Sequence, residues 1–187
     1  MAEVWLKTNR RALGLGMLLP GLFAAVCATA LAWSIITGKS WLLQLLLLTL
    51  TAIPLWMMAE LLYAIAHPRI AYDAGELLVF LEPARATRVP IEIVEVMFLG
   101  QGPSELPKLG GREPDTRNVI IRLAESATEW KHRNVRPTFG HWCEGYITIR
   151  GAWCEPITAD LMRKLNHRLV EVRREQQTQS RAGNSQP

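Results

Sequence analysis

The chain has 187 residues, of which 49% are hydrophobic and 20% charged, and its 21 Lys and Arg against 17 Asp and Glu give a net charge of +4. A chain of this length forms one or two small units and cannot hold a large multidomain enzyme. The composition excludes a collagen-like protein, a coiled coil, a long disordered chain and a small disulfide-rich scaffold. The charges are unevenly placed, since residues 12–66 contain only Lys39 and Glu60.

Two long apolar stretches fill the first third of the chain. Residues 12–36 carry no charged side chain, and as a helix they would be about 38 Å long, enough to cross a hydrocarbon core of about 30 Å. A second stretch covers residues 41–66, after a turn-like segment at 37–40. We therefore predict a two-helix transmembrane hairpin over residues 12–66, preceded by a cytoplasmic tail at residues 1–11.

The flanking charges predict how this hairpin is oriented. Lys7, Arg10 and Arg11 precede the first stretch, whereas the loop between the stretches contains only Lys39. Lys and Arg are enriched in cytoplasmic flanks. We expect a multi-pass protein of the inner membrane with both termini in the cytoplasm.

A secretory signal peptide is the alternative interpretation of the first stretch. A basic segment precedes the apolar run, and the small residues at positions 28–32 could supply a cleavage site. The run is long for a signal peptide, which favours a membrane span. Cleavage would leave the C-terminal half on the same side of the membrane.

Three residues of the hairpin are candidate contacts with lipid or with a partner. Ala24 and Ala28 are four residues apart, a spacing that lets helix backbones approach closely. They would pack against the second helix or, alternatively, form a dimer contact. Glu60 is the only acidic residue within the spans. We expect it to reach toward the headgroups; the alternative is a polar contact with another helix or a partner subunit.

Residues 67–175 have the pattern of a small β-rich domain. Short apolar or alternating runs predict strands at 70–72, 77–81, 88–98, 118–123, 128–133 and 146–150. Apolar residues at helical spacing then predict an amphipathic helix of about 17 residues that begins at Thr158. Residues 100–117 read as a long surface loop, and residues 176–187 as a disordered tail. The predicted fold class is a membrane helical hairpin plus a domain of six or seven antiparallel strands with a C-terminal helix.

This arrangement is similar to a known family. The similarity lies in the segments RIAYDAGELLVFLEP, RVPIEIVEVMFLG, YITIRGAWCEP and ITADLMRKLNHRLVEV. Together with the preceding hairpin, they resemble bacterial membrane-anchored proteins with a pleckstrin-homology-like domain, over residues 68–175. The resemblance implies seven short strands, a C-terminal helix and a binding or scaffolding module. It does not imply phosphoinositide binding, because the domain has no concentrated basic loop.

The sequence contains no pattern typical of catalysis. His132, His141, Cys143 and Cys154 do not have the spacing of a metal site. No serine elbow, oriented Cys–His pair or phosphate-binding glycine loop is present. We predict that the protein is not an enzyme and has no cofactor or metal. The weaker alternatives are a disulfide between Cys143 and Cys154, and a metal or thiol enzyme built on these residues and His141.

A short basic segment follows Trp130. Lys131, Arg133 and Arg136 are candidate contacts with anionic lipid headgroups, because the domain would already be tethered beside the membrane. Acidic and basic residues nearly balance over the domain, so no nucleic-acid binding is expected.

These features predict a non-enzymatic membrane protein. Its partners would be the lipid bilayer and a protein partner or a second copy in the same membrane. An accessory subunit of a larger transporter or respiratory complex is the alternative.

Overall fold

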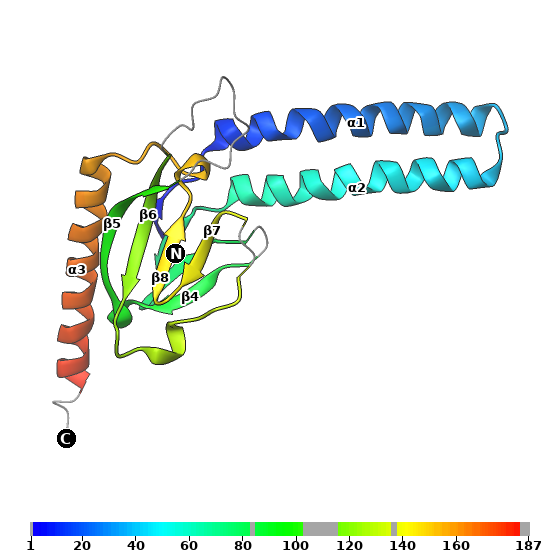
Figure 1. The fold of residues 1–187 in the computed structure, drawn as a ribbon. Helices are drawn as coiled ribbons and strands as arrows, with labels where there is room; N and C mark the ends of the chain where they lie inside the picture. The colour runs from blue at the N-terminus through cyan, green and yellow to red at the C-terminus, as the bar shows by residue number, and fades with distance from the viewer. Residues whose placement is uncertain (1, 83–84, 103–115, 136–137, 184–187) are drawn as a thin grey trace. The chain divides into compact units, whose positions relative to one another are not determined.

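The computed structural model describes residues 2–82, 85–102, 116–135 and 138–183 (Figure 1). The chain divides into two compact units, which are residues 10–66 and a second unit made of residues 1–9 together with residues 67–187. Most of the loop predicted at 100–117 falls outside the described residues. The first unit is a helical hairpin, and the second is the β domain.

Two antiparallel helices, α1 (Arg10–Ile36) and α2 (Trp41–Ala66), form the hairpin (Figure 1). Their inward positions are spaced alternately by three and four residues. These positions are Met17, Pro20, Ala24, Cys27, Leu31 and Ser34 on α1, and Gln44, Leu47, Thr51, Pro54, Met58 and Leu61 on α2. This average spacing of 3.5 residues is typical of left-handed coiled-coil packing. At Gly21 an added Cβ would lie 3.6 Å from the sulfur of Met58, which is an ordinary van der Waals distance.

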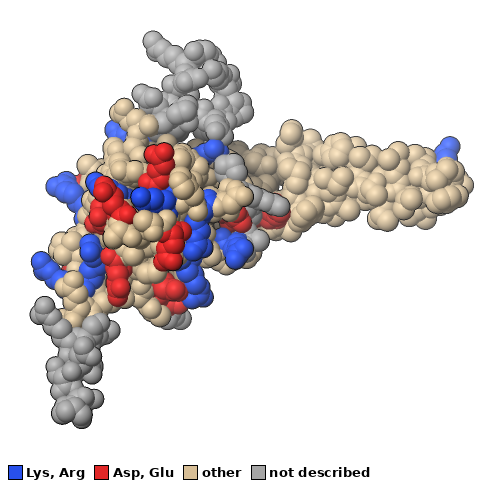
Figure 2. Space-filling view, turned by 60° about the horizontal axis from the view of Figure 1, so that its bottom comes forward, with Lys and Arg blue, Asp and Glu red and all other residues tan. Residues whose placement is uncertain are grey.

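The outer surface of the hairpin is apolar. In the most apolar 18-residue window of each helix, only 11% of the residues are buried. Figure 2 shows almost no charged side chains on the hairpin. Both helices are therefore long and apolar enough to cross a membrane, and the predicted hairpin of apolar helices is confirmed.

The β domain contains two antiparallel sheets. The first has the order β1-β2-β3-β4 and consists of β1 (Glu3–Leu6), β2 (Ile70–Asp73), β3 (Glu76–Val79) and β4 (Thr87–Pro90). The second has the order β5-β6-β8-β7 and consists of β5 (Val94–Gly102), β6 (Thr116–Leu123), β7 (Gly140–Cys143) and β8 (Tyr146–Ile149). Helix α3 (Ala159–Gly183) lies along β5 (Figure 1). A β-rich domain with a C-terminal helix is thus confirmed.

Inward-facing side chains of both sheets and of α3 share one core. Leu77, Val89, Ile121, Ile147 and Leu169 are among its fully or nearly fully buried members. The apolar stripe of α3 is explained by this contact, because a helix that covers a sheet must be apolar on one side.

Several local predictions need correction. The strand predicted at 88–98 is two strands of different sheets, β4 and β5, which a 3₁₀ turn at Ile91–Ile93 separates. The predicted strand at 128–133 is replaced by a 3₁₀ helix at Thr128–Trp130. The strand β7 was not predicted. Helix α3 continues to Gly183 and so enters the segment 176–187, which was expected to be disordered.

The largest difference from the sequence prediction lies at the N-terminus. Residues 1–11 read as a tail, but β1 forms the edge of the first sheet and pairs with β2 through Glu3↔Tyr72, Val4↔Ala71 and Leu6↔Ile70. The side chain of Leu6 is fully buried, and the rings of Trp5 and Tyr72 stack with centroids 5.6 Å apart. The strands that precede α1 and follow α2 are therefore neighbours in one sheet.

A bidentate ion pair also fixes β1 to α3. The guanidinium of Arg168 donates from Nε to Oε1 of Glu3 at 2.9 Å and from Nη2 to Oε2 at 3.0 Å. The hydrogen bond from Arg168 is the main reason why the pKa of Glu3 lies below its ordinary value. A carboxyl group whose pKa is lower in the folded state stabilises that state when it is ionised.

We therefore expect the anchoring of β1 to depend on pH. The Glu3 carboxylate contributes to the stability of the folded state above about pH 4.3, where a free glutamate is ionised. This contribution to stability is lost as the pH falls further, because the carboxylate is then protonated in the folded state as well. Replacing Arg168 by Met should speed hydrogen exchange of the β1 amides at pH 7, and the difference from wild type should shrink at pH 3. An equal difference at both pH values would contradict a role for the ion pair.

Candidate functional site

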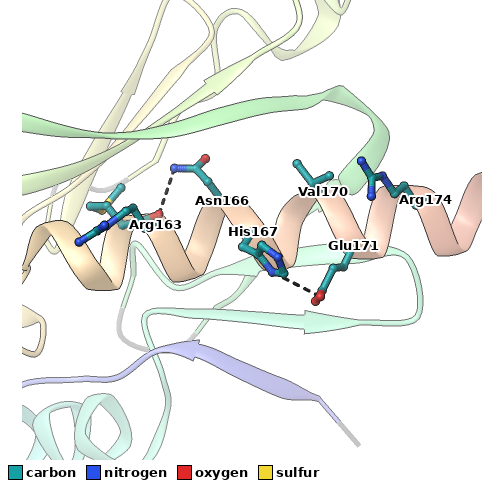
Figure 3. Close-up of a pocket in the computed structure, with 7 residues that line it drawn as sticks. Arg163, Asn166, His167, Val170, Glu171 and Arg174 are labelled. Carbon is teal, nitrogen blue, oxygen red and sulfur yellow. Dashed lines mark hydrogen bonds and ion pairs between the residues drawn. The ribbon is translucent and has the colours of Figure 1, made fainter.

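A hollow of about 580 Å³ lies along one side of α3 (Figure 3). The residues that line it recur every four positions along α3, mostly as neighbouring pairs, so they share one side of the helix. They are Met162, Arg163, Asn166, His167, Val170, Glu171 and Arg174.

Asn166 fixes the edge of this hollow to the second sheet. Its Oδ1 accepts the backbone N–H of Met97 at 2.9 Å, and its Nδ2 donates to the carbonyl of Met97 at 2.6 Å. The side-chain amide thus makes the two hydrogen bonds that a neighbouring strand would make to β5. Unpaired strand edges are sites where other chains add, and α3 covers this one at Met97.

The chemistry of the hollow is apolar at its centre and mainly basic around it. The side chain of Val170 is 46% exposed, and in Figure 3 it projects from the same side of α3 as Asn166 and Arg174. Nδ1 of His167 lies 3.3 Å from Oε1 of Glu171. Such a surface can accept an apolar side chain that has acidic neighbours.

The sequence predicted an amphipathic helix here and no binding surface on it. It did not single out Asn166 or Val170, because neither interrupts the amphipathic pattern. The only available signal was the position of this valine, outside the apolar stripe of the helix.

The basic segment after Trp130 packs on aromatic rings. The guanidinium of Arg133 lies 4.1 Å from the ring centroid of Trp130, which stacks on Trp142 with centroids 5.9 Å apart. Lys131 is exposed, and its carbonyl accepts the N–H of Gly145 in the turn between β7 and β8. Arg136 lies outside the described residues.

This segment is far along the domain from the residues that lead into the hairpin. The carbonyl of Lys131 is bonded to Gly145, which directly precedes β8. The N–H of Asn9 donates to the carbonyl of Trp153, which follows the end of β8. Asn9 directly precedes α1. The contact with the ring of Trp130 is made by Arg133, and a contact of Lys131 and Arg133 with lipid headgroups stays a prediction.

The residues of the hairpin that were predicted to contact lipid or a partner do not all face the same way. Ala24 is 5% exposed and belongs to the seam between the helices, whereas Ala28 is exposed and lies outside it. Glu60 is half-buried on α2. The structure does not bring Ala24 and Ala28 together on one contact surface, because a spacing of four drifts away from a seam with a spacing of 3.5.

The cysteines are all free thiols. Cys154 is 1% exposed, and burial raises its pKa to about 12, so its thiol is protonated at neutral pH. Cys143 is exposed. Among the described residues, no three His, Cys, Asp or Glu side chains are placed to hold a metal ion.

Comparisons of the chain with models of protein families, with curated proteins and with solved structures find no match. The function must therefore be inferred from the fold and from the surface residues of this chain.

Proposed function

We propose that this is a non-enzymatic inner-membrane protein whose β domain is a protein-binding or scaffolding module on the cytoplasmic face. The observation that carries the proposal is the pairing of β1 with β2. Because these strands flank the hairpin and share one sheet, both ends of the hairpin lie on the same side of the membrane. The two helices then cross the bilayer as a pair.

The flanking charges support a cytoplasmic β domain. Lys7 precedes α1, Arg10 and Arg11 are its first two residues, and the loop at the other end of the hairpin contains only Lys39. This asymmetry is the one found for cytoplasmic flanks. The β1–β2 pairing also argues against cleavage of the first helix, because cleavage would separate β1 from the rest of its chain.

The architecture of the β domain supports a binding role. Two antiparallel four-stranded sheets with a C-terminal helix agree with the pleckstrin-homology-like fold that the sequence resembles. The hollow on α3 offers the partner an apolar position at Val170 beside Arg163 and Arg174. The partner segment would present an apolar side chain flanked by acidic ones. Tethering to the membrane raises the effective concentration of any partner in the same bilayer.

Site-specific crosslinking in native membranes tests this function. A photoreactive amino acid at Val170 should give one discrete adduct, with either a partner protein or a second copy, and Arg174→Glu should reduce its yield severalfold. The matched control is the same amino acid at Val4, which is 49% exposed on β1. No adduct from Val170, or equal yields from both positions, would exclude α3 as the binding surface.

An accessory subunit of a larger membrane complex is the second candidate, and the outward position of Ala28 favours it. Ala28 and Glu60 would then contact helices of other subunits. Replacing Ala28 by Leu and Glu60 by Gln should shift the protein to a smaller species in native electrophoresis, whereas Ala25→Leu, at another exposed position of α1, should not. An unchanged migration of the double variant would exclude this candidate.

A further inference from the structure

Arg69 is the bulkiest fully buried side chain among the described residues, with 1% of its surface exposed. Its backbone N–H donates to the carbonyl of Leu6 at 2.8 Å, and its own carbonyl accepts the N–H of Phe80 at 3.0 Å. These two hydrogen bonds hold the backbone of Arg69, which directly precedes β2, between the ends of β1 and β3. The backbone atoms from which its side chain extends are therefore fixed in position.

The buried guanidinium has no acidic partner within the described chain. Its central carbon lies 3.6 Å from the ring centroid of Phe139, and Nε donates to the carbonyl of Trp153 at 3.3 Å. Nη2 is buried and has no hydrogen-bond partner among the described residues. Burial lowers the pKa of Arg69 to about 10, so the group is still charged at neutral pH.

This arrangement is unusual for a charge in a protein interior. Buried charges are normally paired with an opposite charge and fully hydrogen-bonded. An aromatic face and one long hydrogen bond compensate the charge of Arg69 only in part. If the residue served packing alone, methionine or leucine would fill the volume without the cost of desolvating a cation.

The position of Arg69 along the chain indicates which kind of anion it could meet. It lies three residues after the last residue of α2, and the hydroxyl of Thr8 donates to the carbonyl of His67 at 2.6 Å. The carbonyl of Trp153 that receives Nε of Arg69 also receives the N–H of Asn9. Arg69 thus lies at the end of the β domain where the chain leaves for both apolar helices. Where those helices cross a bilayer, this end is next to the phosphate layer.

We propose that Arg69 binds a phosphate-class oxyanion, with Nη2 as the free donor, as part of the membrane role proposed above. A guanidinium presents its donors in a planar fork that matches the oxygens of a phosphate. Of the two aromatic neighbours of the guanidinium, Phe139 is buried and Trp153 is half-buried, and their rings pack edge-on with centroids 5.9 Å apart. The source of the anion is either a phospholipid headgroup or free phosphate, and the two are distinguished by experiment.

The test measures thermal unfolding of the full chain, purified and delipidated in a neutral maltoside detergent. Sodium phosphate is compared with sodium chloride at equal ionic strength, and nanodiscs containing phosphatidylglycerol are compared with nanodiscs of phosphatidylcholine alone. A ligand that binds only the folded state raises its stability. We expect the midpoint to rise by several degrees with phosphate or with phosphatidylglycerol, and the arm with the larger rise identifies the source.

Variants show whether the response depends on Arg69. Arg69→Met should abolish the rise, and Arg69→Lys, which keeps the charge but loses the fork, should reduce it. Arg88→Met is the matched control, because Arg88 makes an exposed ion pair with Glu76; it should respond like wild type. If Arg69→Met does not fold, the proposal is judged by comparing the rise in unfolding midpoint of Arg69→Lys with that of wild type. No rise in wild type in either arm, or an equal rise in the Lys variant, would overturn the proposal. Because no partner protein is present, a failure here leaves the crosslinking result from Val170 unaffected.

Discussion

Replacing Leu6 by alanine should destabilise the β domain by about 2–5 kcal/mol, the usual cost of removing a fully buried leucine side chain. Leu6 is fully buried and belongs to the core that joins both sheets, although it stands before the first apolar helix. The loss should be seen in every strand of the first sheet, since β1 pairs with β2 and β2 with β3. Hydrogen exchange of the β-domain amides, measured on the full chain in mild detergent, reports it.

The matched control is Val4→Ala on the same strand. Val4 is 49% exposed, and surface substitutions of this kind usually change stability by less than about 0.5 kcal/mol. If the Leu6 and Val4 variants exchange alike, residues 3–6 are not part of the domain. The inference that both ends of the hairpin lie on the same side of the membrane would then lose its basis.

The hairpin could be predicted from the sequence because its cause is local. A run without charges that is long enough to cross a bilayer has few alternative structures, and the break at Gly38 separates the two helices. The amphipathic stripe of α3 was predictable for the same reason, since Leu165 and Leu169 have helical spacing.

The β1 strand could not be predicted, because its cause is not local. The segment Glu3–Leu6 is too short to be recognised as a strand, and its partner β2 lies beyond the whole hairpin. A strand of four residues is stable only in the sheet that it joins. The 3₁₀ helix at Thr128–Trp130 was missed for a related reason: burial of Trp130 against Trp142, and not a period of two, sets the conformation there.

The role of Arg69 was also hidden in the sequence. Next to a membrane span, an arginine is most simply a charge that fixes orientation. Its burial depends on Phe139 and Trp153, which are far along the chain and belong to the second half of the domain. No pattern around residue 69 contains that information.

The turn at Gly151 should be the other position where a small change has a large effect. A Cβ at Gly151 would overlap the carbonyl oxygen of Arg117 and would lie 2.9 Å from Cδ1 of Ile157. The first obstacle is backbone, which cannot rotate away as a side chain can. We expect Gly151→Ala to destabilise the β domain by about 1–3 kcal/mol, the typical cost of overpacking, and to fall at the upper end of that range. Thermal unfolding of the full chain in detergent measures the loss.

The loss of stability at this turn should also affect the N-terminal segment. The N–H of Gly151 donates to Oδ1 of Asn118 at 3.1 Å, and the turn it begins presents the Trp153 carbonyl that binds Asn9 and Arg69. Gly151→Ala should therefore speed hydrogen exchange at Asn9 as well as in β6. Gly145→Asn is the control, since space there is open and Asn tolerates its φ of +78°. If the Gly151 and Gly145 variants lose stability equally, the close approach to Arg117 is not what requires glycine at position 151.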